Sequence, residues 1–417
     1  MSDAWVSFLP GPVPVHPEVS RAFAGPAISH RSAAFHAQMG EVKRRLCDLV
    51  VLPNVQILVG SGTLANDAVG AQLSLLPGRG LVLSNGEFGE RLIEQAGRFG
   101  LAFTPLRSEW GEPLPLDEAS QTVEPIEWIW AVHCETSTGV LNDLPRLADL
   151  ARERGAKLCV DAISSVGNAA VDLSGAWLAT ATSGKGLAAY PGLGLVFHHD
   201  EIAPSPRLPR YLDLGLWARE GGVPFTASSN LLAALERALE IRGAQETQCA
   251  RLAADLRPRI ERLGFSCLAP VESAAPWVLT LLPPAGTNAF VLGERLEAAG
   301  FLLSYRSGYL VRRNWLQICL MGEHEASAIG RLVDVLAGWL DTDFVQLPFD
   351  LELHQLDRNR QREVDLVVKQ AVGRGGVVES GDGDGSGLSR GQAEDQLAAP
   401  VRGAVDVVVD RDAVDER

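Results

Sequence analysis

Short apolar runs alternate with longer helical stretches between about residues 20 and 243, and this alternation restricts the fold more than any other feature. Strands separated by helices of about 10–15 residues indicate crossover connections and a mainly parallel sheet. Runs such as WIWAV and LCV are continuously apolar, which suits strands buried on both faces. The expected strands are 55–59, 81–83, 128–133, 158–160 and 193–197, and the expected helices are 63–75, 88–99, 144–154 and 230–242.

The chain of 417 residues is predicted to contain two folded domains flanked by two extensions. A second helix and strand pattern, distinct from the first, occupies 249–263, 277–282, 289–299, 316–320 and 326–340. Residues 371–417 hold no aromatic residue and include SGDGDGSG, so they bury too little apolar surface to offset the entropy of ordering. The predicted regions are an N-terminal arm (1–20), a large α/β domain (21–243), a small α+β domain (244–345) and an acidic, disordered tail (346–417).

Composition excludes several classes of function. The 52 acidic against 37 basic residues give a net charge of −15, which argues against nucleic acid as a partner. A small anion can still be bound by local backbone dipoles. The 6 cysteines form no C-x-x-C pair and the histidines lack ligand spacing, so no metal site is predicted. Without a signal peptide or a run of about 18 apolar residues, the chain is expected to be cytoplasmic and free of membrane contacts.

The segment VGSGTLAN lies where a strand passes into a helix, a position that favours phosphate binding. Gly60, Ser61, Gly62 and Thr63 would place small residues and hydroxyls at the unpaired N–H groups of the helix start. The segment also resembles a dinucleotide fingerprint, but the next strand ends in Ser-Asn rather than the acid that binds ribose. A plain glycine turn that packs the helix against the strand is the simpler alternative.

Asp161 follows the apolar run LCV, and Lys185 lies later in the turn TSGKG, so a carboxylate and a lysine are expected at neighbouring strand ends. Pyridoxal 5′-phosphate needs a lysine for its Schiff base, an anion beside its ring nitrogen and a phosphate cradle. Taken singly, Asp161 could be a helix N-cap and Lys185 a solvated turn charge. Together with VGSGTLAN, the two residues meet all three requirements in chain order, which indicates this cofactor.

The chain resembles the class V aminotransferases of the fold-type I pyridoxal-phosphate superfamily, the group of alanine–glyoxylate and serine–pyruvate aminotransferases. The resemblance extends from residue 8 to about 240 and weakens in the small domain. It implies a mainly parallel large domain, a smaller α+β domain and a homodimer with a shared active site. The matching stretches are FLPGPVPVHPEV, ISHRSAAF, GSGTLANDA, SNGEFGERL, VHCETSTGVLNDL, VDAISSVG and SGKGLAAYPGLGLV.

The resemblance also implies roles for individual residues. Lys185 would form the Schiff base and then carry the proton between the substrate and the cofactor, while Asp161 would pair with the ring nitrogen. The other implied contacts are Ser61, Gly62, Thr63 and Ser183 to the phosphate, Phe88 and Thr136 to the ring, Thr226 to the phosphate of the partner subunit, and Gly11 to the substrate.

Two positions depart from the family pattern. Gly184 stands before the lysine, where the family has a His, Gln or Arg that contacts the cofactor. Gln317 stands where the family has the arginine that binds the substrate carboxylate, and an amide cannot replace a charged bidentate guanidinium. Either another arginine takes that role or the substrate presents no free α-carboxylate there. The candidate arginines are Arg306, Arg312 and Arg313.

Three other functions remain open from the sequence. A lyase such as a cysteine desulfurase or a kynureninase-like enzyme uses the same constellation, although a desulfurase needs a mobile cysteine and Cys319 lies in an apolar run. A catalytically silent regulatory protein could retain the fold and the cofactor. A nicotinamide dehydrogenase is disfavoured by the missing ribose-binding acid.

Overall fold

The structure, a computed structural model, describes residues 5–242 and 245–340 of the chain. The expected acidic tail at 346–417 lies outside the described residues, and so does the expected domain boundary at 243–244. None of the helices within the described ranges is both long enough and apolar enough to cross a membrane.

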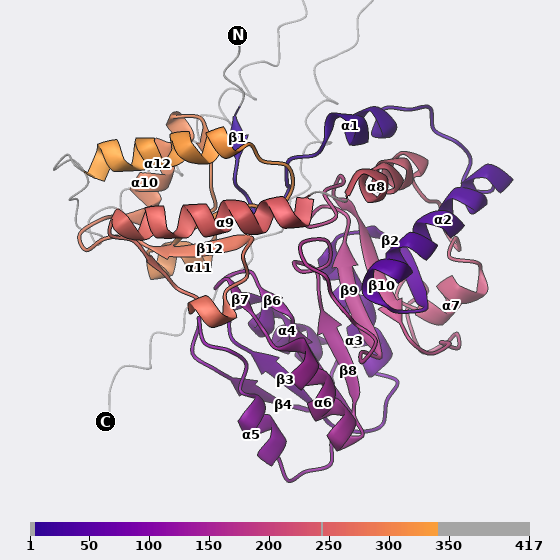
Figure 1. The fold of residues 1–417 in the computed structure, drawn as a ribbon. Coiled ribbons are helices and arrows are strands. Elements are labelled where there is room, and N and C mark those ends of the chain that lie inside the picture. Colours follow the sequence, from indigo (N-terminus) through magenta and orange to yellow (C-terminus); the bar gives the residue numbers. More distant parts are fainter. Residues whose placement is uncertain (1–4, 243–244, 341–417) are drawn as a thin grey trace, which may run out of the picture. The chain divides into compact units, whose positions relative to one another are not determined.

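A seven-stranded sheet organises the described part of the chain up to residue 242 (Figure 1). Its strand β10 runs antiparallel to β2 and β9, while the other neighbours pair in parallel. The prediction of a mainly parallel sheet is thus confirmed, with β10 as the exception. The strand order is β2 (Asn54–Gly60), β10 (Gly192–His198), β9 (Leu178–Thr182), β8 (Lys157–Asp161), β5 (Trp128–Val132), β3 (Gly80–Ser84) and β4 (Phe103–Arg107).

Both faces of this sheet are buried, as continuously apolar strands require. Successive strand residues point to opposite faces, so Ile57 and Leu81 join one apolar core, whereas Leu58 and Val82 join the other. The first core also contains residues of α2 (Ala33–Val50), α6 (Leu144–Arg154) and α8 (Ser229–Ile241). The second contains residues of α3 (Gly62–Leu73), α4 (Glu87–Arg98) and α7 (Leu214–Arg219).

Local sequence signals fix where several of these helices begin and end. The Asp143 side chain accepts a hydrogen bond from the N–H of Arg146 and caps α6, which ends at Gly155 with φ 63°. Asp213 and Ser228 cap α7 and α8 in the same way. The shorter elements of this region are α1 (Pro17–Phe23), α5 (Leu116–Gln121) and the two-stranded pair of β6 (Cys134–Glu135) and β7 (Val140–Leu141).

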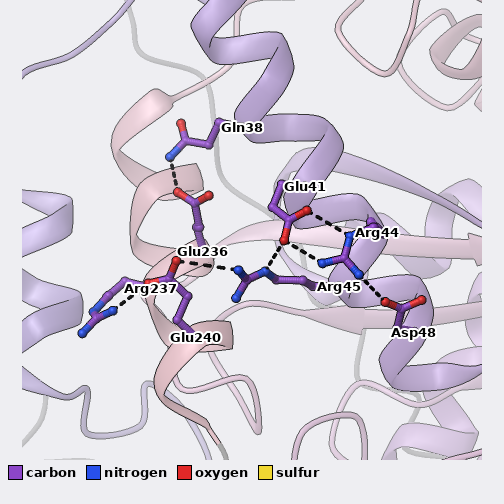
Figure 2. Close-up of polar contacts among 8 residues, drawn as sticks. All are labelled: Gln38, Glu41, Arg44, Arg45, Asp48, Glu236, Arg237 and Glu240. Atoms are coloured by element: carbon purple, nitrogen blue, oxygen red, sulfur yellow. Dashed lines mark hydrogen bonds and ion pairs between the residues drawn. The ribbon is translucent and has the colours of Figure 1, made fainter.

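Half-exposed polar side chains connect α2 to α8 (Figure 2). The Gln38 amide donates to the Glu236 carboxylate at 2.6 Å, and Arg45 contacts both Glu41 at 2.6 Å and Glu240 at 3.9 Å. Exposed ion pairs of this kind contribute about 0–1 kcal/mol each. The apolar residues of α2 and α8 in the first core therefore hold these helices in place more than the ion pairs do.

A separate apolar core lies in the C-terminal part of the described chain. It is built on an antiparallel sheet ordered β11–β12–β14, and it includes Phe8 and Val13 of the N-terminal arm. The arm is further tied to this part by β1 (Val6–Ser7), which pairs in parallel with β13 (Phe301–Leu302). The other elements are α9 (Gln245–Arg262), β11 (Ser266–Cys267), a 3₁₀ turn (Val271–Ser273), β12 (Val278–Leu282), α10 (Ala289–Ala298), α11 (Gly308–Arg313), β14 (Leu316–Cys319) and α12 (Ala326–Leu340).

Candidate active site

A cavity of about 970 Å³ lies at the carboxyl ends of β2, β5, β8 and β9, where sheets of this type commonly bind ligands. Asp161 is the last residue of β8, and Lys185 follows the end of β9 by three residues. Both side chains line this cavity. The structure therefore brings together the two residues that the sequence predicted as cofactor partners, on the same edge of the sheet.

Asp161 is buried and is held by two hydrogen bonds. Its Oδ2 accepts from the Asn66 amide at 2.7 Å, and its Oδ1 accepts from the backbone N–H of Ile163 at 3.0 Å. Asn66 is itself fixed, because its amide oxygen accepts from the Thr180 hydroxyl at 2.7 Å. Burial raises the pKa of Asp161, whereas the hydrogen bond from Asn66, that from Ile163 and the charge of Lys185 oppose the rise. Sequence reasoning missed Asn66, although a polar residue among the apolar residues of α3 was a usable signal.

Lys185 is partly buried in the wall of the cavity. Its Nζ lies 5.8 Å from the centroid of the Phe88 ring. Burial lowers the pKa of Lys185, and the partial compensation by Cys319 and Asp161 does not restore the usual value. A lysine with a lowered pKa loses its proton readily, which is what a nucleophilic or proton-transferring amine needs. Gly11 of the N-terminal arm also lines the cavity, and a Cβ there would lie 3.6 Å from Lys185 Cε.

The N-terminus of α3 faces the same cavity with free donors. Ser61 is its N-cap, but the Ser61 hydroxyl makes no capping hydrogen bond. The first bond back to Ser61 comes from Ala65 at 3.3 Å, so the N–H groups of the preceding turn have no partner within the helix. Gly62 is required by packing, since a Cβ there would lie 2.6 Å from Ile163 Cδ1. Ser61, Gly62 and Thr63 all line the cavity, so this helix start can receive an anion.

Phe88, in the first turn of α4, is positioned by a carboxylate to which sequence reasoning assigned no role. Glu135 is fully buried, and its Oε2 accepts from the N–H groups of Phe88 at 3.1 Å and Gly89 at 2.9 Å. Its Oε1 accepts from the N–H of Ser137 at 3.1 Å and from the Ser137 hydroxyl at 2.5 Å. Burial raises the pKa of Glu135, and these hydrogen bonds lower it. The signal for this role was an acidic residue three positions beyond the end of the buried strand β5.

The remaining predicted cofactor contacts differ in their surroundings. Thr136 lines the cavity, and its hydroxyl donates to Ser164 Oγ at 2.6 Å. The Ser183 hydroxyl is buried and donates to the Tyr190 carbonyl at 2.7 Å, so it is already engaged within its own turn. Thr226 is exposed and does not line this cavity, which leaves it free for the contact with a partner subunit that was predicted.

Gly184 has a packing reason for its departure from the family pattern. A Cβ at this position would lie 2.8 Å from both Cα and Cβ of Pro191. Any larger residue before Lys185 would therefore displace the chain at Pro191. The space of the missing side chain is filled by backbone and proline.

Gln317 does not face the cavity. Its side chain is fully buried in β14, and its amide nitrogen donates to the Thr136 carbonyl at 2.6 Å and to Thr280 Oγ1 at 2.8 Å. Its amide oxygen accepts from the Tyr309 hydroxyl at 3.0 Å. The amide is thus satisfied by the protein itself and has no group left for a substrate.

The three arginines that the sequence offered as replacements do not line the cavity either. Arg306 is paired with the carboxylates of Glu294 and Glu297. Arg312 and Arg313 are exposed on α11, and the guanidinium of Arg313 lies 4.0 Å from the centroid of the Trp110 ring. The structure therefore leaves the carboxylate-binding role at positions 306, 312 and 313 unsupported.

The cysteine expected of a desulfurase is poorly placed for nucleophilic attack. Cys319 is fully buried in β14, and burial raises the pKa of its thiol to about 12. Only the thiolate is strongly nucleophilic, so this side chain is inert at neutral pH.

Comparison with known proteins gives concordant matches. The model of the family Aminotransferase class-V matches residues 18–208. A soluble hydrogenase 42 kDa subunit from Anabaena cylindrica is 36% identical over 306 residues, which cover 68% of this chain and 80% of that protein. A 2-aminoethylphosphonate–pyruvate transaminase from Pseudomonas fluorescens is 31% identical over 266 residues, covering 59% and 72% respectively. Among solved structures, an alanine–glyoxylate aminotransferase from Nostoc sp. matches with a TM-score of 0.76 and 27% identity, covering 81% of this chain and 95% of that one.

Proposed function

The chain is an enzyme of the aminotransferase class-V family, and we propose that it uses pyridoxal 5′-phosphate to move an amino group from an amine or amino-acid donor to a 2-oxo acid or aldehyde. The observation that carries this proposal is the meeting of Lys185 and Asp161 in one cavity, beside the open N-terminus of α3. The burial of Cys319 favours this function over that of a lyase. The transaminases among the relatives of the chain favour it too.

The residues around the cavity fit the proposed cofactor. Each oxygen of Asp161 accepts one hydrogen bond from the protein, which leaves lone pairs for a ring N–H. The start of α3 offers unpaired N–H groups and the free Ser61 hydroxyl to a phosphate. The Phe88 ring stands near Lys185 Nζ, where an aromatic cofactor bound to that amine would be stacked.

When bound, the cofactor supplies an aldehyde that condenses with amines and a pyridine ring that withdraws electrons from the reacting carbon. Asp161 keeps a proton on the ring nitrogen, because its charge favours the protonated ring. Lys185 Nζ, biased toward the free amine by burial, would take a proton from the substrate α-carbon and deliver it to the cofactor. Gly11 leaves room beside that amine, since a Cβ there would lie 3.6 Å from Lys185 Cε.

The substrate carboxylate is proposed to bind in an atypical way, because Gln317 is committed to the protein interior. Several relatives are named as 2-aminoethylphosphonate–pyruvate transaminases, and the named amino donor carries a phosphonate in place of a carboxylate. Aminophosphonates therefore belong in the first panel of donors, beside alanine and serine.

We further propose a homodimer that shares its active sites and resides in the cytoplasm. The exposed Thr226 suits a contact to the cofactor phosphate of the partner subunit. All six cysteines are free thiols, as expected for a reducing compartment.

A spectral titration of the purified protein tests the proposal. The bound cofactor should absorb in the visible range, and productive amino donors should bleach that band until a 2-oxo acid restores it. Lys185→Ala should bind cofactor without this reversible cycle. A band that no donor bleaches would favour a catalytically silent protein, and release of sulfide and alanine from cysteine would favour a desulfurase.

A further inference from the structure

Apart from Lys185, two cationic side chains line the cavity within the described residues, and both belong to α4. They are Arg91 and Arg98, which lie seven residues apart and hence on the same side of the helix. Arg91 is the one near the reacting groups, because its Cζ lies 4.9 Å from the centroid of the Phe88 ring. Lys185 Nζ lies 5.8 Å from the same centroid.

Arg91 has hydrogen-bond donors to spare. Its Nε and one terminal nitrogen both contact a single oxygen of Glu87, at 3.3 and 3.2 Å. The other terminal nitrogen makes no hydrogen bond to any residue of the described chain. Arg91 is half-exposed, and an ion pair between exposed partners four residues apart on a helix contributes only about 0.3–0.5 kcal/mol. An anionic ligand can therefore compete with Glu87 for the guanidinium.

Other residues of the cavity lining add hydroxyl groups. Ser304, Ser307 and Tyr309 line the cavity, and the hydroxyls of Ser304 and Ser307 form no hydrogen bond within the described residues. The positive charge of Arg91 acts on both Tyr309 and Lys185, where it opposes the burial-induced rise of the pKa of Tyr309 and adds to the lowering of the pKa of Lys185. The charge of Arg91 thus acts at the reactive amine and at Tyr309 of α11.

We propose that Arg91 binds the oxyanion of the substrate, a carboxylate or a phosphonate, in place of the guanidinium that Gln317 replaces. The inference rests on the proposed function, since it assigns the anion site of that same reaction. A planar guanidinium accepts either oxyanion through paired N–H donors, which an amide cannot do with full charge. The hydroxyls of Ser304 and Ser307 supply further donors to the oxygens that Arg91 leaves uncovered.

Anions without an amino group test this assignment without turnover. Propionate and ethylphosphonate are titrated calorimetrically into the holoenzyme, into the apoenzyme, and into holoenzymes carrying Arg91→Gln, Arg91→Lys or Arg98→Gln. We expect Arg91→Gln to weaken the preferred anion by roughly ten- to hundredfold and Arg91→Lys to recover part of the loss. Arg98→Gln removes the same charge two turns away and should change binding less than threefold. Comparison of the two anions shows whether a carboxylate or a phosphonate is the preferred group.

Equal binding by the wild type and Arg91→Gln would overturn the inference, and so would an equal loss in Arg98→Gln, which would indicate only the general field of α4. Failure of both anions to bind the wild type would do the same. The proposed function fails differently: amino donors would leave the cofactor spectrum unchanged, while the anions still bound in an Arg91-dependent manner.

Discussion

Asn66 governs, at the scale of single residues, how firmly Asp161 holds its charge. Its amide donates to Asp161 Oδ2 at 2.7 Å in a buried site, and Thr180 holds that amide in place. Hydrogen bonds to charged groups contribute about 1.5–3 kcal/mol. Asn66 therefore belongs to the site as a positioning residue that acts through the Asp161 carboxylate.

We expect Asn66→Leu to raise the cofactor dissociation constant by about ten- to hundredfold, because Asp161 loses its strongest donor and its pKa rises further. Fluorescence titration of the apoenzyme with pyridoxal 5′-phosphate measures this change. Thr180→Val, which removes only the outer hydrogen bond, should have a smaller effect. Similar losses in both variants would show that packing, not the hydrogen bond to Asp161, is responsible.

We expect the buried His133 to make the free energy of unfolding depend on pH. It is buried beside Ser165, whose hydroxyl lies 2.9 Å from Nδ1, and burial lowers the pKa of His133 from 6.5 to about 4. The unfolded chain therefore binds a proton between pH 6.5 and 4 that the folded chain does not. The stability that the neutral, buried His133 allows is fully present above pH 6.5. As the pH falls from 6.5 towards 4, the free energy of unfolding decreases by about 1.4 kcal/mol per pH unit, on the order of 3 kcal/mol in total.

Urea unfolding at several pH values between 7 and 4.5 measures this slope. In His133→Gln the slope should be shallower, whereas His199→Gln, at an exposed position, should leave it unchanged. Parallel slopes in the wild type and His133→Gln would contradict the prediction.

The chain order of residues was enough to predict Lys185 and Asp161, because Asp161 ends an apolar run and Lys185 lies in the glycine turn TSGKG that follows later in the chain. Asn66 and Glu135 could not be assigned in this way, since their roles depend on contacts between segments distant in sequence. The engagement of Gln317 has the same origin: its partners come from positions 136 and 280. Sequence reasoning predicted a departure at Gln317, but the arginines it offered instead do not line the cavity.

At the scale of elements, Glu135 ties the short strand β6 to the start of α4. Its carboxylate accepts hydrogen bonds from three backbone N–H groups and one hydroxyl and donates none, so the group is suited to an ionised acceptor. An acid at a helix N-terminus also interacts favourably with the helix dipole. The position of Phe88 therefore depends on a residue outside its own helix.

We expect Glu135→Gln to lower the free energy of unfolding by about 1–3 kcal/mol, because an amide N–H₂ would face backbone N–H donors. The same variant should weaken cofactor binding, since Phe88 loses its anchor. Glu94→Gln, an exposed change on the same helix, should change stability by less than about 0.5 kcal/mol. Urea denaturation of the apoenzymes gives the free energies of unfolding of both variants. Equal stability of Glu135→Gln and the wild type would refute the anchoring role.

Most elements could be predicted from hydrophobic pattern and end signals, as the expected helix at 144–154 and its end at Gly155 illustrate. The strand β9 (Leu178–Thr182) was missed, because its LATAT sequence has small and polar residues in place of a long apolar run. The hydrophobic pattern also could not predict the direction of β10. A buried strand is apolar throughout in either orientation, so only its pairing with β2 and β9 decides the direction.

At the scale of the whole molecule, the proposed shared site makes a strong prediction about mixed subunits. Lys185 faces the cavity of its own chain, whereas Thr226 is exposed and lies outside that cavity. If Thr226 completes the site of the partner, defects at positions 185 and 226 reside in different chains of one active site. A mixed dimer of two defective chains then contains one site with both residues intact.

Lys185→Ala and Thr226→Arg are therefore expected to be poorly active alone and to regain activity when refolded together. Random pairing makes half of the dimers mixed, each with one intact site of two, so the mixture should recover about a quarter of the wild-type activity per subunit. Sedimentation of the separate variants confirms that each still forms dimers. A Thr226→Ser variant controls for the conservative change and should retain most activity. A mixture no more active than the average of its two components would show that Thr226 does not act on the neighbouring site.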